Sequence, residues 1–254
     1  MSNLKEKIEK VKKAFDKNNA IAESEMRKII QGYVENPSEF EQYQPQYRPE
    51  LFRKAVNEKT TPIMEDVNKM NIVFNQKVKA IIEEEKSAIL PKPKEKSADY
   101  SIRISNALKY LEIEGEKLDD DIAYEILKDF MDDYEQMKLF KNVIRRQMKL
   151  EILEGYDGKC ILPKTFGNFN KMEMIINTFS EMESIANVLF LKNQTKKEQF
   201  IFYNARVELP LLSVPGYQEL TNEENIINLA EIIDSEVKRM NNIAMDKSYV
   251  NITE

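Results

Sequence analysis

The chain has 254 residues and a formal net charge of −6, with 42% hydrophobic and 32% charged residues. It contains no histidine, no tryptophan, 6 glycines and a single cysteine, Cys160. These counts exclude an intramolecular disulfide and any catalytic or metal site that depends on histidine or on a pair of cysteines. Glycine is also too scarce for the turns of an all-β or nucleotide-binding α/β fold, so we expect a mostly helical protein.

The composition also bears on localisation. The N-terminus is charged from the start and no apolar run of about 18 residues occurs, so we expect neither a signal peptide nor a transmembrane helix. A single cysteine fits a reducing compartment. The abundance of Lys, Asn, Ile and Glu suggests an A- and T-rich coding sequence, as in low-GC bacteria and their phages. We therefore expect a cytoplasmic protein, or a virion component if a phage encodes it, with no membrane partner and no cofactor.

Residues 1–35 form the first predicted helix. Its apolar residues alternate four and three positions apart, as in a coiled-coil seam, and begin with Leu4, Ile8, Val11 and Phe15. Asn18 would occupy the next seam position. The other faces are mostly charged, so the narrow stripe needs a cover. We predict that these four apolar residues bind another chain, with packing on the protein's own body as the alternative.

Residues 36–48 interrupt the helical pattern, because prolines at 37 and 45 forbid a continuous helix. The segment also contains two tyrosines, Tyr43 and Tyr47. We predict a linker or wrapping arm whose tyrosines dock on a neighbouring chain.

Residues 49–90 are expected to form two successive helices. The first begins at Pro49, and the second begins with Thr61 as N-cap and Pro62 at the first helical position, which is the favoured place for proline. A lysine- and proline-rich linker, 91–97, follows.

Residues 98–254 are expected to form the main helical domain. A helix from Asp99 should end at Gly115, a suitable C-cap. The next stretch, from Leu118 to Gly155, reads as one amphipathic helix with acids in its first half and bases in its second, which complements the helix dipole.

Three later segments carry possible helix-start signals, each with an acid three residues after a polar residue. The first, Asn170 with Glu173, opens a strongly apolar helix whose predicted core residues are Ile176, Phe179, Ile185 and Leu189. Thr195 with Glu198 predicts another helix through Phe200–Tyr203, and 209–217 is then a loop. Thr221 with Glu224 predicts the last helix, and the final ten residues are expected to fray.

Carboxylates are the remaining candidates for chemistry. Asp129 and Asp133 are four positions apart on one predicted helix face, and oxygen ligands suit Mg²⁺. The alternative for the neighbouring run Asp119–Asp121 is an N-cap with a dipole-complementing first turn, which we favour over a metal site. Gly155–Lys159 lacks the spacing of a phosphate-binding loop.

A basic face follows on the same predicted helix. It comprises Lys138, Lys141, Arg145 and Lys149. Three interpretations are open: a solvated face with ion pairs, a surface for an acidic protein partner, or a phosphate-binding face for nucleic acid.

The sequence therefore predicts an all-α, bundle-like array of about seven helices with proline-rich linkers and minor or no β structure. We expect a non-catalytic helical assembly or adaptor protein that binds other protein chains, with its own copies as one option and a phage or virion role as another. The alternatives are a nucleic-acid-associated accessory factor that uses the Lys138–Lys149 face, and a Mg²⁺-dependent enzyme built on carboxylates alone.

Overall fold

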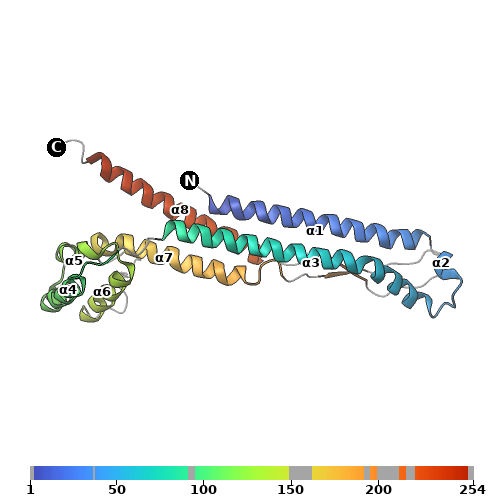
Figure 1. The fold of residues 1–254 in the computed structure, drawn as a ribbon, viewed down its shortest axis with the longest axis horizontal. Coiled ribbons are helices and arrows are strands. Elements are labelled where there is room, and N and C mark those ends of the chain that lie inside the picture. The colour runs from blue at the N-terminus through green and yellow to red at the C-terminus, as the bar shows by residue number, and fades with distance from the viewer. Residues whose placement is uncertain are drawn as a thin grey trace. The chain divides into compact units, whose positions relative to one another are not determined.

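The computed structural model describes residues 3–36, 38–90, 95–148, 162–191, 195–198, 212–215 and 221–250. Within these ranges helix dominates, which confirms the predicted all-α array, and the β structure is one short antiparallel pair of strands. The chain divides into two compact units (Figure 1). Unit 1 comprises Met1–Glu85 with Ser180–Asp234, and unit 2 comprises Lys86–Phe179 with Ser235–Glu254. The segment predicted as one main domain, 98–254, thus contributes to both.

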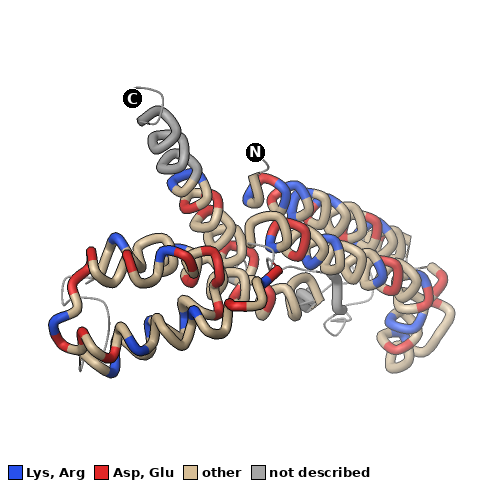
Figure 2. Tube along the Cα trace, turned by 60° about the vertical axis from the view of Figure 1, so that its left-hand side comes forward, with Lys and Arg blue, Asp and Glu red and all other residues tan. Residues whose placement is uncertain are grey.

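Unit 1 is built on a long antiparallel helical hairpin. Its arms are α1 (Leu4–Glu35) and α3 (Arg48–Ile89), joined through the short α2 (Ser38–Glu41). Figure 1 shows the two arms side by side. Contacts along the hairpin pair early residues of one arm with late residues of the other, from Lys7 with Glu85 to Tyr33 with Phe52. Acidic and basic residues are interspersed along both arms (Figure 2), as expected for helices with one buried face.

The seam of α1 is covered by this chain itself. Leu4, Ile8 and Phe15 are at most 3% exposed, and Val11 is half-buried. Phe15 stacks on the ring of Phe190, with 4.1 Å between centroids. The stripe expected to face another chain therefore lies in the core of unit 1. Hydrophobic burial explains this, because α3 presents a buried face that is mostly apolar, with Phe74, Val78 and Ile82 among its members.

Of the predicted linker 36–48, the described residues, 36 and 38–48, form a compact turn at the end of the hairpin rather than a loose arm. The Arg48 guanidinium donates hydrogen bonds to the carbonyl oxygens of Tyr43 and Glu41, both at 2.8 Å. Three aromatic rings pack edge to face beneath the turn: Tyr33, Phe40 and Phe52.

The predicted helix boundary at Thr61 is wrong, because α3 continues through Pro62. A proline inside a helix removes one backbone hydrogen bond and costs about 3 kcal/mol. Apolar side chains on both sides of it, including Val56 and Val67, are buried in the hairpin. Because breaking the helix would uncover one of these halves, packing outweighs the local penalty.

Unit 2 contains α4 (Tyr100–Glu114), α5 (Asp120–Leu127), α6 (Tyr134–Gln147) and the first part of α7 (Pro163–Ala186). The short 3₁₀ turn η1 (Gly115–Lys117) connects α4 to α5, and a second 3₁₀ turn, η2 (Lys128–Phe130), follows α5. Gly115 ends α4 with a φ of +52°, which confirms the predicted C-cap. The core is formed by Ala107, Leu111, Leu118, Ala123, Leu127, Phe130, Met137, Phe140, Ile144, Leu162, Phe166 and Phe169.

The single helix predicted from Leu118 to Gly155 is two helices. Asp133 caps α6, its carboxylate accepting a hydrogen bond from the backbone N–H of Gln136 at 3.2 Å. The preceding turn buries Phe130 against Phe140, with 5.1 Å between ring centroids. The apolar spacing alone did not reveal this break, because α5 and α6 both bury their apolar residues in the same core. Residues 149–161, which include Lys149, the segment Gly155–Lys159 and Cys160, lie outside the described residues.

Helix α7 begins at Pro163, seven positions before the predicted start at Asn170. The carboxylate of Asp120, on α5, accepts hydrogen bonds from the backbone N–H groups of Lys164 and Thr165 at 2.7 and 3.0 Å. A carboxylate at this end of a helix satisfies free N–H groups and complements the dipole. Because this cap comes from more than 40 residues away in the sequence, local spacing could not predict it.

Burial of the predicted core residues of this segment is confirmed for two of the four. Phe179 and Leu189 are at most 1% exposed, whereas Ile176 and Ile185 are half-buried. The Asn75 side chain of α3 donates hydrogen bonds to the carbonyl oxygens of Ala186 and Leu189, at 2.6 and 2.7 Å. These bonds satisfy backbone carbonyl groups at and just beyond the C-terminal end of α7.

The helix predicted from Thr195 is instead a strand, β1 (Thr195–Glu198). It pairs antiparallel with β2 (Leu212–Pro215), which falls in the predicted loop 209–217. Pairing between segments so far apart is a tertiary event that overrides a local capping signal. Phe200–Tyr203 lie outside the described residues. Helix α8 (Thr221–Val250) begins where predicted, but continues to Val250 where fraying was expected.

Candidate protein-binding surface

The acidic side chains proposed for metal binding have structural roles. Asp129 forms an ion pair with Arg103, whereas Asp133 accepts hydrogen bonds from the Tyr100 hydroxyl at 2.6 Å and from Lys96 at 2.9 Å. The two carboxylates thus serve different partners. Among the residues that the structure describes, no group of three or more His, Cys, Asp or Glu side chains is placed to hold a metal ion.

Residues Asp119–Asp121 stabilise the beginnings of helices, in agreement with the interpretation favoured from the sequence. Asp119 caps α5 by accepting a hydrogen bond from the backbone N–H of Ile122 at 2.8 Å. Asp120 caps α7, and Asp121 forms a 2.8 Å ion pair with Lys164.

The Tyr100–Asp133 pair is held in one protonation state at neutral pH. Burial alone would raise the pKa of Asp133, but the hydrogen bonds from Tyr100, Lys96 and the Gln136 N–H hold it below its ordinary value. Burial, together with the hydrogen bond to Asp133, raises the pKa of Tyr100 well above its ordinary value. The hydrogen bond therefore joins a protonated phenol to an ionised carboxylate at neutral pH.

The predicted basic face of α6 is only partly free. Lys138 and Arg145 are exposed, but Lys141 is half-buried, pairs with Glu173 at 2.7 Å and lies over the Phe169 ring. Arg146 and Leu139 are also exposed on the solvent side of α6. We define the basic face of α6 as Lys138, Leu139, Arg145 and Arg146.

The predicted protein-binding residues separate into two groups. Three of the seam residues of α1, Leu4, Ile8 and Phe15, belong to the core of unit 1, and Val11 is half-buried. Tyr43 and Tyr47 are 44% and 55% exposed at the turn of the hairpin, so these two side chains remain accessible.

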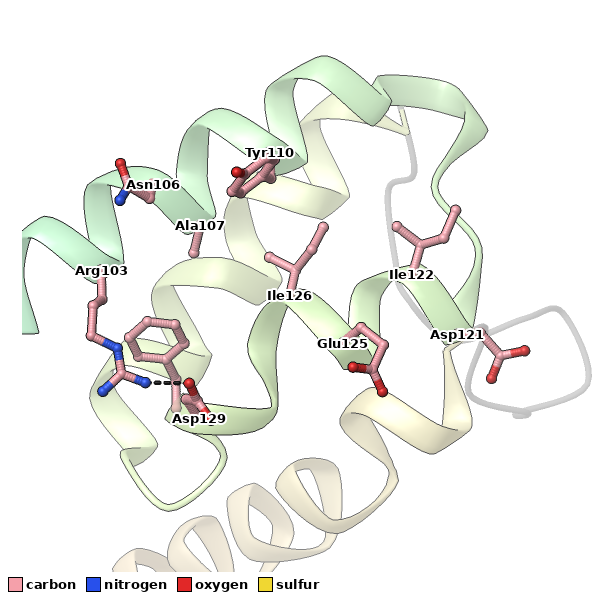
Figure 3. A pocket seen from close by; sticks show the side chains of 10 residues that line it. Arg103, Asn106, Ala107, Tyr110, Asp121, Ile122, Glu125, Ile126 and Asp129 are labelled. Carbon is pink, nitrogen blue, oxygen red and sulfur yellow. Dashed lines mark hydrogen bonds and ion pairs between the residues drawn. The ribbon is translucent and has the colours of Figure 1, made fainter.

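A groove of about 580 Å³ lies between α4 and α5 (Figure 3). Figure 3 shows Ile126 pointing from α5 toward Tyr110 of α4, and the Arg103–Asp129 ion pair at one end. The apolar lining consists of Ala107, Tyr110, Ile122, Ile126 and Phe130. The polar lining consists of Arg103, Asn106, Asp121, Glu125 and Asp129.

An exposed apolar stripe borders this groove on α4. Ile102, Tyr110 and Ile113 are 62%, 60% and 76% exposed. Their spacing, with Asn106 between them, places all four on one side of the helix. We call these four residues the α4 stripe; Asn106 and Tyr110 belong both to it and to the groove.

The sequence pattern did not predict the α4 stripe, because apolar residues follow one another so closely along this helix that spacing alone does not distinguish Ile102 from the core residues Ala107 and Leu111. The available signal was an excess of apolar residues: α4 carries them on its core-facing side and also on the opposite side, more than one core-facing stripe requires. Adjoining exposed apolar residues are typical of surfaces that meet another molecule.

No protein-family model, curated protein or solved structure matches this chain. The surface itself therefore provides the evidence for function. Among the described helices, none combines the length and apolar content needed to cross a bilayer.

Proposed function

We propose that this protein is a non-catalytic helical assembly or adaptor protein that binds another protein chain through unit 2. The observation that carries the proposal is the α4 stripe beside the α4–α5 groove. Ile113 and Ile102 are more than three-fifths exposed on the outer side of a helix whose opposite side already fills the core. The exposure of these two side chains has no role in the folding of unit 2. A partner that covered them would remove their apolar surface from water.

The energetics of such a contact are adequate for specific binding. Fully burying an aliphatic or aromatic side chain contributes about 1.5–3 kcal/mol relative to exposure. Tyr110 lies where the stripe meets the groove, and tyrosine is enriched among the residues that dominate protein–protein binding energies. An exposed apolar row beside a concave apolar floor is the arrangement by which grooves accept amphipathic helices.

The polar groups of the groove favour recognition over catalysis. Its acids already have basic neighbours: Asp121 pairs with Lys164, Glu125 with Lys128, and Asp129 with Arg103. Charged groups around an apolar centre resemble the rim of a protein interface, which sets specificity and orientation. As part of this proposal we place the protein in the cytoplasm, or in a virion if a phage encodes it.

The test replaces two exposed residues of the α4 stripe by serine. We expect Tyr110→Ser with Ile113→Ser to leave the circular dichroism spectrum unchanged but to abolish both self-association and the specific co-purification of any partner. The matched control is Ile72→Ser with Met70→Ser, two exposed apolar residues of α3 in unit 1. Light scattering and quantitative affinity purification would measure the effect. Identical association of wild type, variant and control would contradict the proposal.

A further inference from the structure

We infer that the occupant of the α4–α5 groove is the basic face of α6 on a second copy of this chain. This inference rests on the proposed function and assigns its binding surface a partner of defined chemistry. Both surfaces belong to unit 2, so every copy carries one of each.

The groove and the basic face of α6 carry complementary charges. The groove lining carries three acids, Asp121, Glu125 and Asp129, against one base, Arg103. Helix α5 has three acidic residues and no basic one, whereas α6 has four basic residues and one acidic one. Three of those four bases are exposed. Opposed charges of this kind guide two surfaces into register and exclude like-charged alternatives.

The spacing of the charges is also compatible. Asp121 and Glu125 are four positions apart on α5, and Lys138 and Arg146 are eight positions apart on α6. At 1.5 Å per helical residue, these pairs span about 6 Å and about 12 Å. The basic face of α6 is therefore long enough to lie against both acids of α5.

The basic face also contains one exposed apolar residue, Leu139. Leu139 is 44% exposed on α6, and helical periodicity places it on the same side as Arg146. The groove offers half-buried Ile122 and Ile126 next to Tyr110. Inserting Leu139 there would cover apolar surface on both copies.

The geometry of unit 2 requires that the two surfaces come from different copies. The buried face of α6, with Met137, Phe140 and Ile144, packs into the same core as α5. Lys138, Arg145 and Arg146 are exposed on the side of α6 away from that core. A helix cannot present its solvent-facing side to a groove of the unit into which its other side is packed.

The ion pairs within one copy do not oppose this contact strongly. Lys164 and Lys128, the partners of Asp121 and Glu125, are themselves 46% and 50% exposed. Exposed pairs of this kind contribute little to stability, so their acids can turn toward a second partner at small cost.

The contact joins two different surfaces, so it is heterologous rather than two-fold symmetric. Such a contact repeats from copy to copy, and builds a ring if the rotation closes or an open chain if it does not. Association should therefore continue beyond the dimer as concentration rises, and should weaken as salt screens the facing charges.

The decisive experiment exchanges the charges. One full-length variant carries Asp121→Lys with Glu125→Lys, and the other carries Lys138→Glu with Arg145→Glu. Each alone should self-associate at least about tenfold more weakly than wild type, because like charges then face each other. An equimolar mixture should recover association, because each altered surface again meets its opposite. Sedimentation or light scattering measures the mass, and circular dichroism confirms that each variant is folded.

The matched control is Lys13→Glu with Lys17→Glu, an equal charge change on exposed positions of α1, which should leave association unchanged. Should either reversed variant misfold, Asp121→Asn with Glu125→Gln, or Lys138→Gln with Arg145→Gln, replaces it and should also weaken association. A wild-type protein that stays monomeric at every concentration, or a mixture that does not recover, overturns the inference. If Tyr110→Ser with Ile113→Ser abolishes binding to a different protein while the charge variants behave as wild type, the inference fails and the proposed function stands.

Discussion

Asn19 of α1 and Asn71 of α3 face each other across the hairpin of unit 1, with 3.4 Å between Asn19 Nδ2 and Asn71 Oδ1. Both are buried, at 8% and 2% exposure, and Asn19 Nδ2 also donates to the Phe15 carbonyl oxygen at 2.9 Å. A polar pair inside an apolar seam costs stability but penalises any sliding of one helix along the other. The contact therefore favours one register of the hairpin. The seam position belongs to Asn19, which is buried, rather than to Asn18, which the sequence pattern placed there.

The pair predicts opposite effects for single and double substitutions. Asn71→Leu should lower the free energy of unfolding by about 1–3 kcal/mol, because it removes a partner of the buried Asn19 amide. Asn19→Leu with Asn71→Leu should recover most of that loss, since an apolar pair suits the seam. Urea unfolding would measure both. A double variant no more stable than Asn71→Leu would show that the two amides act independently.

The hydrogen bonds to Asp133 predict acid sensitivity in unit 2. Because folding lowers the pKa of this carboxyl from its ordinary value of 3.8, its contribution is fully present above that value and is lost as pH falls through the lower folded pKa. Wild type should therefore lose more stability below about pH 4 than Asp133→Asn. Urea midpoints at several pH values would measure the difference, with the exposed Glu112→Gln as control. Parallel pH profiles for wild type and Asp133→Asn would contradict this assignment.

Phe179 should be among the most sensitive positions of α7. Its side chain is fully buried, so Phe179→Ala should cost about 3–5 kcal/mol through lost burial and the cavity left behind. Met174→Ala on the same helix, where the side chain is 39% exposed, should cost much less. Thermal melting of both variants would test the contrast, and a wild-type melting temperature for Phe179→Ala would contradict it.

Removal of residues 1–35 should unfold unit 1 rather than release an independent arm. The deletion strips α3 of the apolar face that covers it, and also removes the N–H groups of Leu4 and Lys5 that donate to Asp234 at 3.0 Å. We expect loss of helical signal and precipitation of the truncated chain. A truncated protein that stays folded and only drops in oligomeric state would instead support an association role for α1.

Much of the secondary structure could be predicted because its causes are local. Apolar residues three and four positions apart identified the helices around Phe15, Leu111 and Ile233, and Gly115 marked a helix end through its positive φ. The errors occurred where distant residues decide the outcome. Asp120 starts α7 from another helix, and strand pairing converts the apparent capping box at Thr195 into β1.

The candidate surface shows the same division. The sequence by itself determined that α1 has a stripe needing a cover, and that α6 has a basic side, because helical periodicity alone places residues on a face. Only the tertiary structure decided that α3 helps to bury the stripe of α1, that Glu173 pairs with Lys141, and that Tyr110 and Ile113 of α4 remain exposed. The physical reason is that periodicity identifies which residues share a face, whereas the free energy of covering that face depends on elements that folding brings from elsewhere in the chain.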